Sequence, residues 1–248
     1  MINFFRNIRQ KLLGSNQFNK YLLYAIGEII LVVIGILIAL QINNWNESRK
    51  ERIKETYYLK SVNTSIDLSQ RELLRVINDS KEISDNADEL LNLLAEKEFD
   101  RLNGIGLDSL LFNAADWSII SLNDAGIREI LNTGALDVIK DEDIRVILAS
   151  WDERLHKIKK FENETEYIAH NYAEHISGYT DVSLIISDSS KSAVIPEKRE
   201  MLLHDPQLRN YLFHIAFSHR DMNDKYIKEK VFLDSLHTMI DVYLKDRN

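Results

Sequence analysis

Residues 21–42 read YLLYAIGEIILVVIGILIALQI, an apolar segment interrupted by a single charged residue, Glu28. An α-helix needs roughly 20 such residues to cross the hydrocarbon core of a bilayer. The run continues without the small-residue cleavage pattern of a signal peptide, and the chain has no cysteine that could carry a lipid. The segment therefore predicts a transmembrane helix that is kept as an anchor, with Tyr24 and Trp45 at its interfaces.

Three parts are predicted along the chain. Residues 1–20 form a basic amphipathic segment that can lie against anionic lipid head groups, residues 21–42 span the bilayer, and residues 43–248 form a soluble domain. Basic residues flank both ends of the span, so charge alone hardly decides the orientation. The short and purely basic N-terminal tail favours a cytoplasmic N-terminus, which would place the domain outside the cytoplasm.

Glu28 suggests that two spans pair. A carboxylate in hydrocarbon costs about 2.5 kcal/mol or more on insertion scales unless it is protonated or paired. At about 100° per residue, Gly35 and Ala39 fall on the same side of the helix as Glu28, in the small-residue pattern that lets two helices approach closely. An equally open alternative is that Glu28 reaches the head groups and that Gly35 and Ala39 are ordinary membrane-helix residues.

The soluble domain has the composition of a helical protein, with two prolines and eight glycines in 248 residues. A three-four spacing of apolar residues predicts three long helices: one that continues from the span to about residue 97, one from 141 to 178, and one from the Asp205-Pro206 pair. Short helices in residues 100–138 are predicted as a cap at the far end. The fold class is thus all-α. The core positions predicted for the first helix are Leu59, Val62, Ile66, Ser69, Leu73, Val76, Ser80, Ile83, Ala87, Leu90 and Leu94.

Five polar residues at core positions are the candidate site. If consecutive long helices run antiparallel, Glu162 and His219 fall level with Ser69 to Ser80, and Glu229 lies one to two turns further from the membrane. Together they would form a buried acid, imidazole and hydroxyl cluster that binds a ligand or senses pH. The more common role of such residues is to set helix register through local hydrogen bonds.

Charge and motifs exclude several classes of function. The first 42 residues hold four of the 31 Lys and Arg and one of the 39 Asp and Glu, so the remainder carries about −11 and is unsuited to nucleic acid. The pair Glu153-x-x-His156 has the spacing of half a di-iron site but lacks the second half. We therefore expect no metal, no cofactor and no catalytic residue of a recognisable enzyme class.

Two stretches are similar to a known family. Residues 20–47, KYLLYAIGEIILVVIGILIALQINNWNE, with the upstream MINFFRNIRQKLL, resemble the N-terminus of a family of uncharacterised single-pass membrane proteins of Bacteroidota. Residues 127–151, IREILNTGALDVIKDEDIRVILASW, resemble its second recurrent block. The resemblance implies a bacterial inner-membrane protein with a helical, periplasmic domain, and it implies no activity.

Three functional hypotheses follow. The leading one is a membrane-anchored scaffold or adaptor that forms homo-oligomers through its span and first long helix and presents its domain to an unknown envelope protein. The second is a sensor that binds a small molecule or protons in the bundle core. The third is an enzyme with an unfamiliar site.

Overall fold

The computed structural model describes residues 18–101, 104–184 and 191–247. Over these residues the chain is all-α, as predicted, and forms no strand; an isolated bridge pairs Thr180 with Val194. The chain divides into two compact units, residues 1–55 and 56–248. The predicted basic segment lies outside the described residues as far as residue 17.

The first unit contains the beginning of helix α2, whose bounds are Phe18–Glu96. In the described part of the chain this is the helix that is long and apolar enough to cross a membrane. All its large apolar side chains from Leu22 to Ile42 are exposed, which in water would be unfavourable and in lipid is not. Its borders at residues 21 and 42 stay a prediction.

The second unit is built on three long helices, which are the later part of α2, α6 (Trp151–Ser177) and α9 (Pro206–Lys245). The predicted end of the first helix and the predicted start of the third lie within a residue of those observed. The second predicted helix is divided at Ser150, where α5 ends and α6 begins. The connecting elements are η1 (Phe99–Arg101), α3 (Gly104–Asn113), α4 (Ala125–Thr133), η2 (Ala135–Val138), α5 (Glu142–Ala149), η3 (Pro196–Lys198) and α8 (Arg199–Leu203).

Local capping explains where these helices begin and end. The carboxylate of Asp205 accepts a hydrogen bond from the Gln207 amide at 2.8 Å, and Pro206 occupies the first turn of α9. Asp141 caps α5 in the same way by accepting from the Ile144 amide at 2.9 Å. Gly134 ends α4 in the left-handed conformation, with φ of 66°.

The core follows the predicted seam. All eleven core positions predicted for the first helix are buried. The nine apolar residues among them divide between two hydrophobic clusters. One cluster joins residues 58–76 of α2 to α4, α5 and the C-terminal half of α9, and the other joins residues 83–94 to α3, α8 and the N-terminal half of α9.

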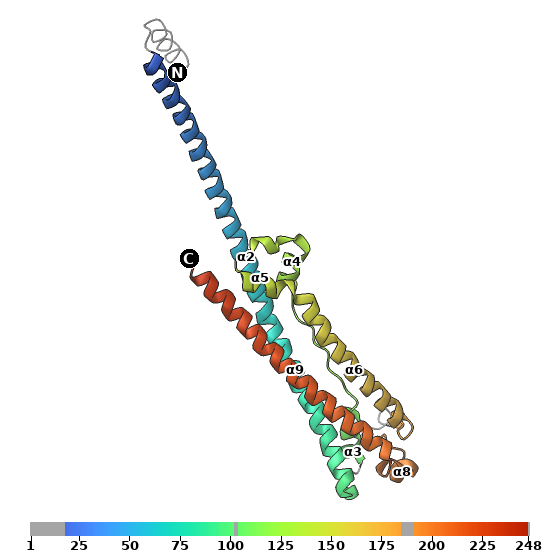
Figure 1. The fold of residues 1–248 in the computed structure, drawn as a ribbon. Coiled ribbons are helices and arrows are strands. Elements are labelled where there is room, and N and C mark those ends of the chain that lie inside the picture. The colour runs from blue at the N-terminus through green and yellow to red at the C-terminus, as the bar shows by residue number, and fades with distance from the viewer. Residues whose placement is uncertain (1–17, 102–103, 185–190, 248) are drawn as a thin grey trace. The chain divides into compact units, whose positions relative to one another are not determined.

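The direction of the helices corrects one assumption of the sequence analysis. As the residue number rises along α2, the number of its partner on α9 falls, and the same holds between α6 and α9. Helix α9 is therefore antiparallel to both, and α2 and α6 run parallel to each other (Figure 1). The pairs that fix these directions are Asn63–Asp241, Gln70–Asp234 and Ile77–Asn223 for α2 and α9, and Arg154–Glu229, Glu162–Tyr226 and His175–Asp205 for α6 and α9.

An extended segment accounts for the parallel arrangement. Residues 116–124, which we call the strap, have no helical structure and lead from α3 back along α2 to α4. At about 3.3 Å per residue, nine extended residues cover about 30 Å, the length of roughly 20 helical residues. The short helices predicted for residues 100–138 are therefore present but do not lie together at the far end. Helix α3 packs in the second cluster, whereas α4 and η2 pack in the first.

Helix α4 lies directly against the backbone of α2. A Cβ atom added to Gly126 would lie 2.5 Å from the carbonyl carbon and oxygen of Ser61, closer than real contacts allow. The Gly126 amide also donates to the Ser65 hydroxyl at 3.0 Å. The approach of the two helices thus depends on a glycine at this position.

Candidate functional site

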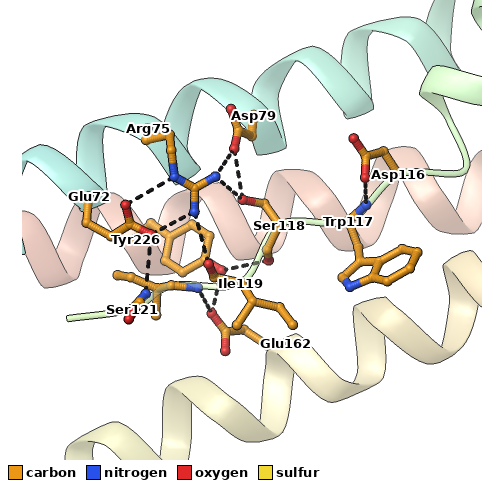
Figure 2. A network of polar contacts seen from close by, with 11 residues as sticks. Glu72, Arg75, Asp79, Asp116, Trp117, Ser118, Ile119, Ser121, Glu162 and Tyr226 are labelled. Carbon is orange, nitrogen blue, oxygen red and sulfur yellow. Dashed lines mark hydrogen bonds and ion pairs between the residues drawn. The ribbon is translucent and has the colours of Figure 1, made fainter.

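The strap is the centre of the polar structure in the bundle (Figure 2). An extended segment has no partners of its own for its backbone N–H and C=O groups, and such groups are costly to bury unpaired. The side chains of α2, α6 and α9 supply these partners.

Arg75 of α2 fixes the start of the strap. Its guanidinium group donates to the Ile119 carbonyl at 3.1 Å and pairs with Glu72 at 2.7 Å and with Asp79. Asp79 in turn accepts from the Ser118 hydroxyl at 3.0 Å. The hydrogen bond from Arg75 holds the pKa of Glu72 below its usual value, so Glu72 stays ionised and can accept from the strap.

Glu162 of α6 holds the middle of the strap. Its Oε1 atom accepts from the Ile120 amide at 2.7 Å and from the Tyr226 hydroxyl of α9 at 2.8 Å. The side chain is almost completely buried, and Lys159 Nζ lies 3.6 Å from Oε2. Burial, followed by the nearby Glu162 carboxylate, raises the pKa of Tyr226, which keeps its hydroxyl protonated as the donor.

A serine and a tryptophan fix the end of the strap. The Ser69 hydroxyl accepts from the Asn123 amide at 2.9 Å and donates to the Asn123 carbonyl at 3.0 Å. The indole N–H of Trp151 donates to Asp124 at 3.1 Å. Trp151 is among the largest fully buried side chains, so the strap ends against the core of the first cluster.

Glu229 belongs to a separate ion pair. Arg154 Nε donates to both carboxylate oxygens of Glu229, at 2.8 and 2.7 Å, and the guanidinium carbon lies 3.3 Å from the centre of the Phe232 ring. Removing one partner of such a buried pair leaves the other charge uncompensated. This arrangement joins α6 to α9 and contains no group from α2.

His219 and Ser80 are buried without hydrogen bonds. The His219 Nδ1 and Ser80 Oγ atoms have no partner among the described residues. Burial lowers the pKa of His219 to about 4, so the imidazole is neutral at pH 7. Helix α9 runs opposite to the direction assumed from the sequence. His219 and Glu229 therefore follow each other along α2 in the order opposite to the predicted one.

The five predicted site residues therefore do not form one cluster. Glu162 and Ser69 hold the same strap at different residues, Glu229 pairs with Arg154, and no hydrogen bond joins His219 or Ser80 to any of them in the described chain. Glu28, Gly35 and Ala39 lie on the exposed stretch of the first unit. A Cβ atom added at Gly35 meets nothing within 4 Å.

A second polar group lies at the start of α9. His175 Nε2 is 2.6 Å from Asp205 Oδ2, which also accepts from the Tyr179 hydroxyl at 3.0 Å. Burial acts to raise the pKa of Asp205, but the hydrogen bonds from Gln207, His175 and Tyr179 hold it below its usual value. Over the described residues, no group of three or more His, Asp or Glu side chains is placed to hold a metal ion.

Sequence reasoning found Glu162 and Ser69 but missed what they bind. The strap reads DWSIISLND, which has no periodicity that separates it from a short helix or loop. Arg75 was missed because it lies off the apolar seam. One signal was present: Glu72, Arg75 and Asp79 stand at i−3 and i+4 spacing on one side of the helix, which is typical of a preformed ion-pair row.

The fold and the site define a class of protein: an all-α chain with one long apolar N-terminal helix and a helical bundle that holds an extended strap against its surface. Residues 28–171 match the model of a family of unknown function, DUF6090. The match covers more than half of the chain and includes the whole strap, so the protein belongs to this family. No curated protein and no solved structure matches the chain.

We expect the Tyr226→Phe substitution to destabilise the bundle by about 1–3 kcal/mol, because the buried Glu162 carboxylate loses a donor. Glu162→Gln weakens the same contact. In a double-mutant cycle the two substitutions should couple by about 0.5–3 kcal/mol. Urea unfolding of the full chain in detergent measures both quantities. Tyr167→Phe, at an exposed position of α6, is the control and should change stability by less than about 0.5 kcal/mol. Strictly additive effects would contradict the described contact.

The buried His219 should make stability depend on pH. Its pKa is about 4 in the folded chain and about 6.5 when unfolded, so between these values the unfolded state binds more protons. Stability is therefore full above pH 6.5 and falls as the pH is lowered towards 4, by up to about 3 kcal/mol. Comparing urea midpoints at pH 7 and pH 4.5 tests this. His219→Leu should flatten the difference, whereas the exposed His156→Gln should leave it unchanged.

Proposed function

We propose that this protein is a membrane-anchored helical scaffold that presents its bundle to a protein partner. The first unit would cross a bacterial inner membrane with its N-terminus in the cytoplasm, and the bundle would lie in the periplasm. The observation that carries the proposal is the continuous exposure of large apolar side chains from Leu22 to Ile42. Such a surface is stable only when lipid or another apolar helix covers it.

The residue pattern of the span supports a homo-oligomer. Glu28, Gly35 and Ala39 share one side of an exposed helix. The space beside Gly35 is open, because a Cβ atom added there meets nothing within 4 Å. Small residues let two helix backbones approach closely in lipid, where packing and interhelical hydrogen bonds drive association.

The polar contacts between the helices and the strap support a structural role. Arg75, Glu162 and Ser69 are all engaged with the strap, and Arg154 is engaged with Glu229. These groups hold three helices and an extended segment in one arrangement. The net negative charge of the domain suits a basic or neutral protein partner better than an anionic one.

A sensor is the second candidate, and one feature favours it. A hollow beside the strap reaches Glu162 and is lined by Ile120, Ser121, Leu122, Leu155, His156, Ile158, Lys159 and Glu162. A small molecule bound there would contact the group that joins the strap to α9. Its signature would be a ligand-induced rise in thermal stability that Glu162→Gln abolishes, which a pure scaffold would not show.

Cysteine labelling tests on which side of the membrane the bundle lies. Because the chain has no cysteine, Asp246→Cys introduces a single reporter at the exposed end of α9. We expect a membrane-impermeant maleimide to label it in cells whose outer membrane has been permeabilised. Labelling that requires lysis of the inner membrane would place the bundle in the cytoplasm. Ser48→Cys, just beyond the span, should react under the same condition as Asp246→Cys.

Pairing of the span is tested by cross-linking in native membranes. Val32→Cys lies within about 40° of Glu28 on the helix, so oxidation should produce a disulfide-linked dimer. Gly35→Leu blocks the close approach and should lower the yield several-fold. Gly27 lies about 100° away from Glu28 around the helix, so Gly27→Leu should leave the yield of dimer unchanged. It is a matched control because a Cβ atom added at Gly27 or at Gly35 meets no other atom of the chain within 4 Å. Equal yields from the two variants would contradict pairing through this face.

A further inference from the structure

The outer side of α9 carries a second row of residues that the bundle does not use. Its six members follow a three-four spacing and are all exposed, whereas the core row of α9 lies on the opposite side. Four are large and apolar, and the two in the middle have opposite charges. Phe213 and Phe217 stack with their ring centres 6.4 Å apart. We call this row the outer face; its members are Phe213, Phe217, Arg220, Asp224, Ile227 and Val231.

The outer face is symmetric about one point. Counted from Met222, Arg220 and Asp224 stand two residues away on either side. Phe217 and Ile227 stand five away, and Phe213 and Val231 stand nine away. Turning the row end to end therefore places apolar residues on apolar residues and a positive charge on a negative one. A surface that complements itself under a two-fold rotation is what an isologous dimer requires.

The charges in the middle are available for such a contact. Arg220 donates through Nε to the Ala216 carbonyl at 3.1 Å, and one of its terminal nitrogens lies 3.5 Å from Asp88. Its other terminal nitrogen is left to donate to a carboxylate of a second chain. Asp224 makes no hydrogen bond or ion pair with the described residues. Two such pairs, related by the two-fold axis, would close at the centre of the contact.

We propose that two copies of this chain associate through the outer faces of their α9 helices, antiparallel and centred on Met222. A parallel pair would set Arg220 level with Arg220 and Asp224 level with Asp224, which is unfavourable in a desolvated contact. The antiparallel pair instead forms two Arg220–Asp224 ion pairs flanked by the four apolar layers. This contact goes beyond the pairing of spans proposed above and does not rest on it.

Cross-linking distinguishes the two orientations. Asp221 and Lys228 are both exposed on the same flank of the outer face. In the antiparallel pair, two Asp221→Cys residues lie about 3 Å apart along the helix axis, but two Lys228→Cys residues lie about 18 Å apart. A short bis-maleimide should therefore link the first variant and not the second. Linking both to the same extent indicates a parallel pair, and linking neither indicates no contact; either result overturns the proposal.

Charge reversal tests the central ion pairs. The full chain is studied in detergent micelles with Gly35→Leu present throughout, so that the contribution of span pairing is reduced and is the same in every variant. Arg220→Asp or Asp224→Arg alone should weaken the dimer at least tenfold in sedimentation velocity, and the double variant should restore it. Asp88→Asn, which removes the partner of Arg220 within the chain, should leave the dimer intact. A double variant that stays monomeric, or a parent chain that is monomeric at tens of micromolar, overturns the proposal.

Discussion

The bundle depends on satisfying the backbone of one extended segment. A helix pairs its own N–H and C=O groups, but the strap at residues 116–124 has to take its partners from elsewhere. Glu162 supplies an acceptor from α6, Arg75 supplies a donor from α2, and Ser69 supplies both. Because these side chains come from different helices, the strap binds each helix and thereby also connects the helices with one another.

The strap also determines the topology. Without it, α3 would be followed directly by a helix running back along α2, which is the arrangement expected for consecutive long helices. The nine residues instead return the chain to the beginning of the bundle, so α6 starts there and runs parallel to α2 (Figure 1). The N-terminal end of α4 then packs on α2 through Gly126, where no side chain could be accommodated.

The helices could be predicted from the sequence, but their directions could not. The seam from Leu59 to Leu94 is a local repeat and Asp205-Pro206 is a local start signal. Both depend on neighbouring residues alone, and the structure confirms the buried seam and the start of α9. Helix direction depends on the strap, whose extended form is imposed by partners as far as 108 positions away in the sequence, as between Ser118 and Tyr226. The position of Glu162 along the bundle was predicted correctly although the direction of its helix was not. Glu162 lies near the middle of α6, where reversing the helix changes the position of a residue along the bundle least. His219 and Glu229 lie on either side of the middle of α9, so their order was reversed.

The contact between Asn63 and Asp241 joins residues 178 positions apart. During synthesis, the seam of α2 leaves the ribosome long before α9, the helix that covers it, has been made. Contacts between distant parts of a chain form late, and apolar surface that waits for its partner is prone to aggregation. The bundle therefore cannot close until the last 40 or so residues are available, and a chain truncated before α9 would expose its core to chaperones and proteases.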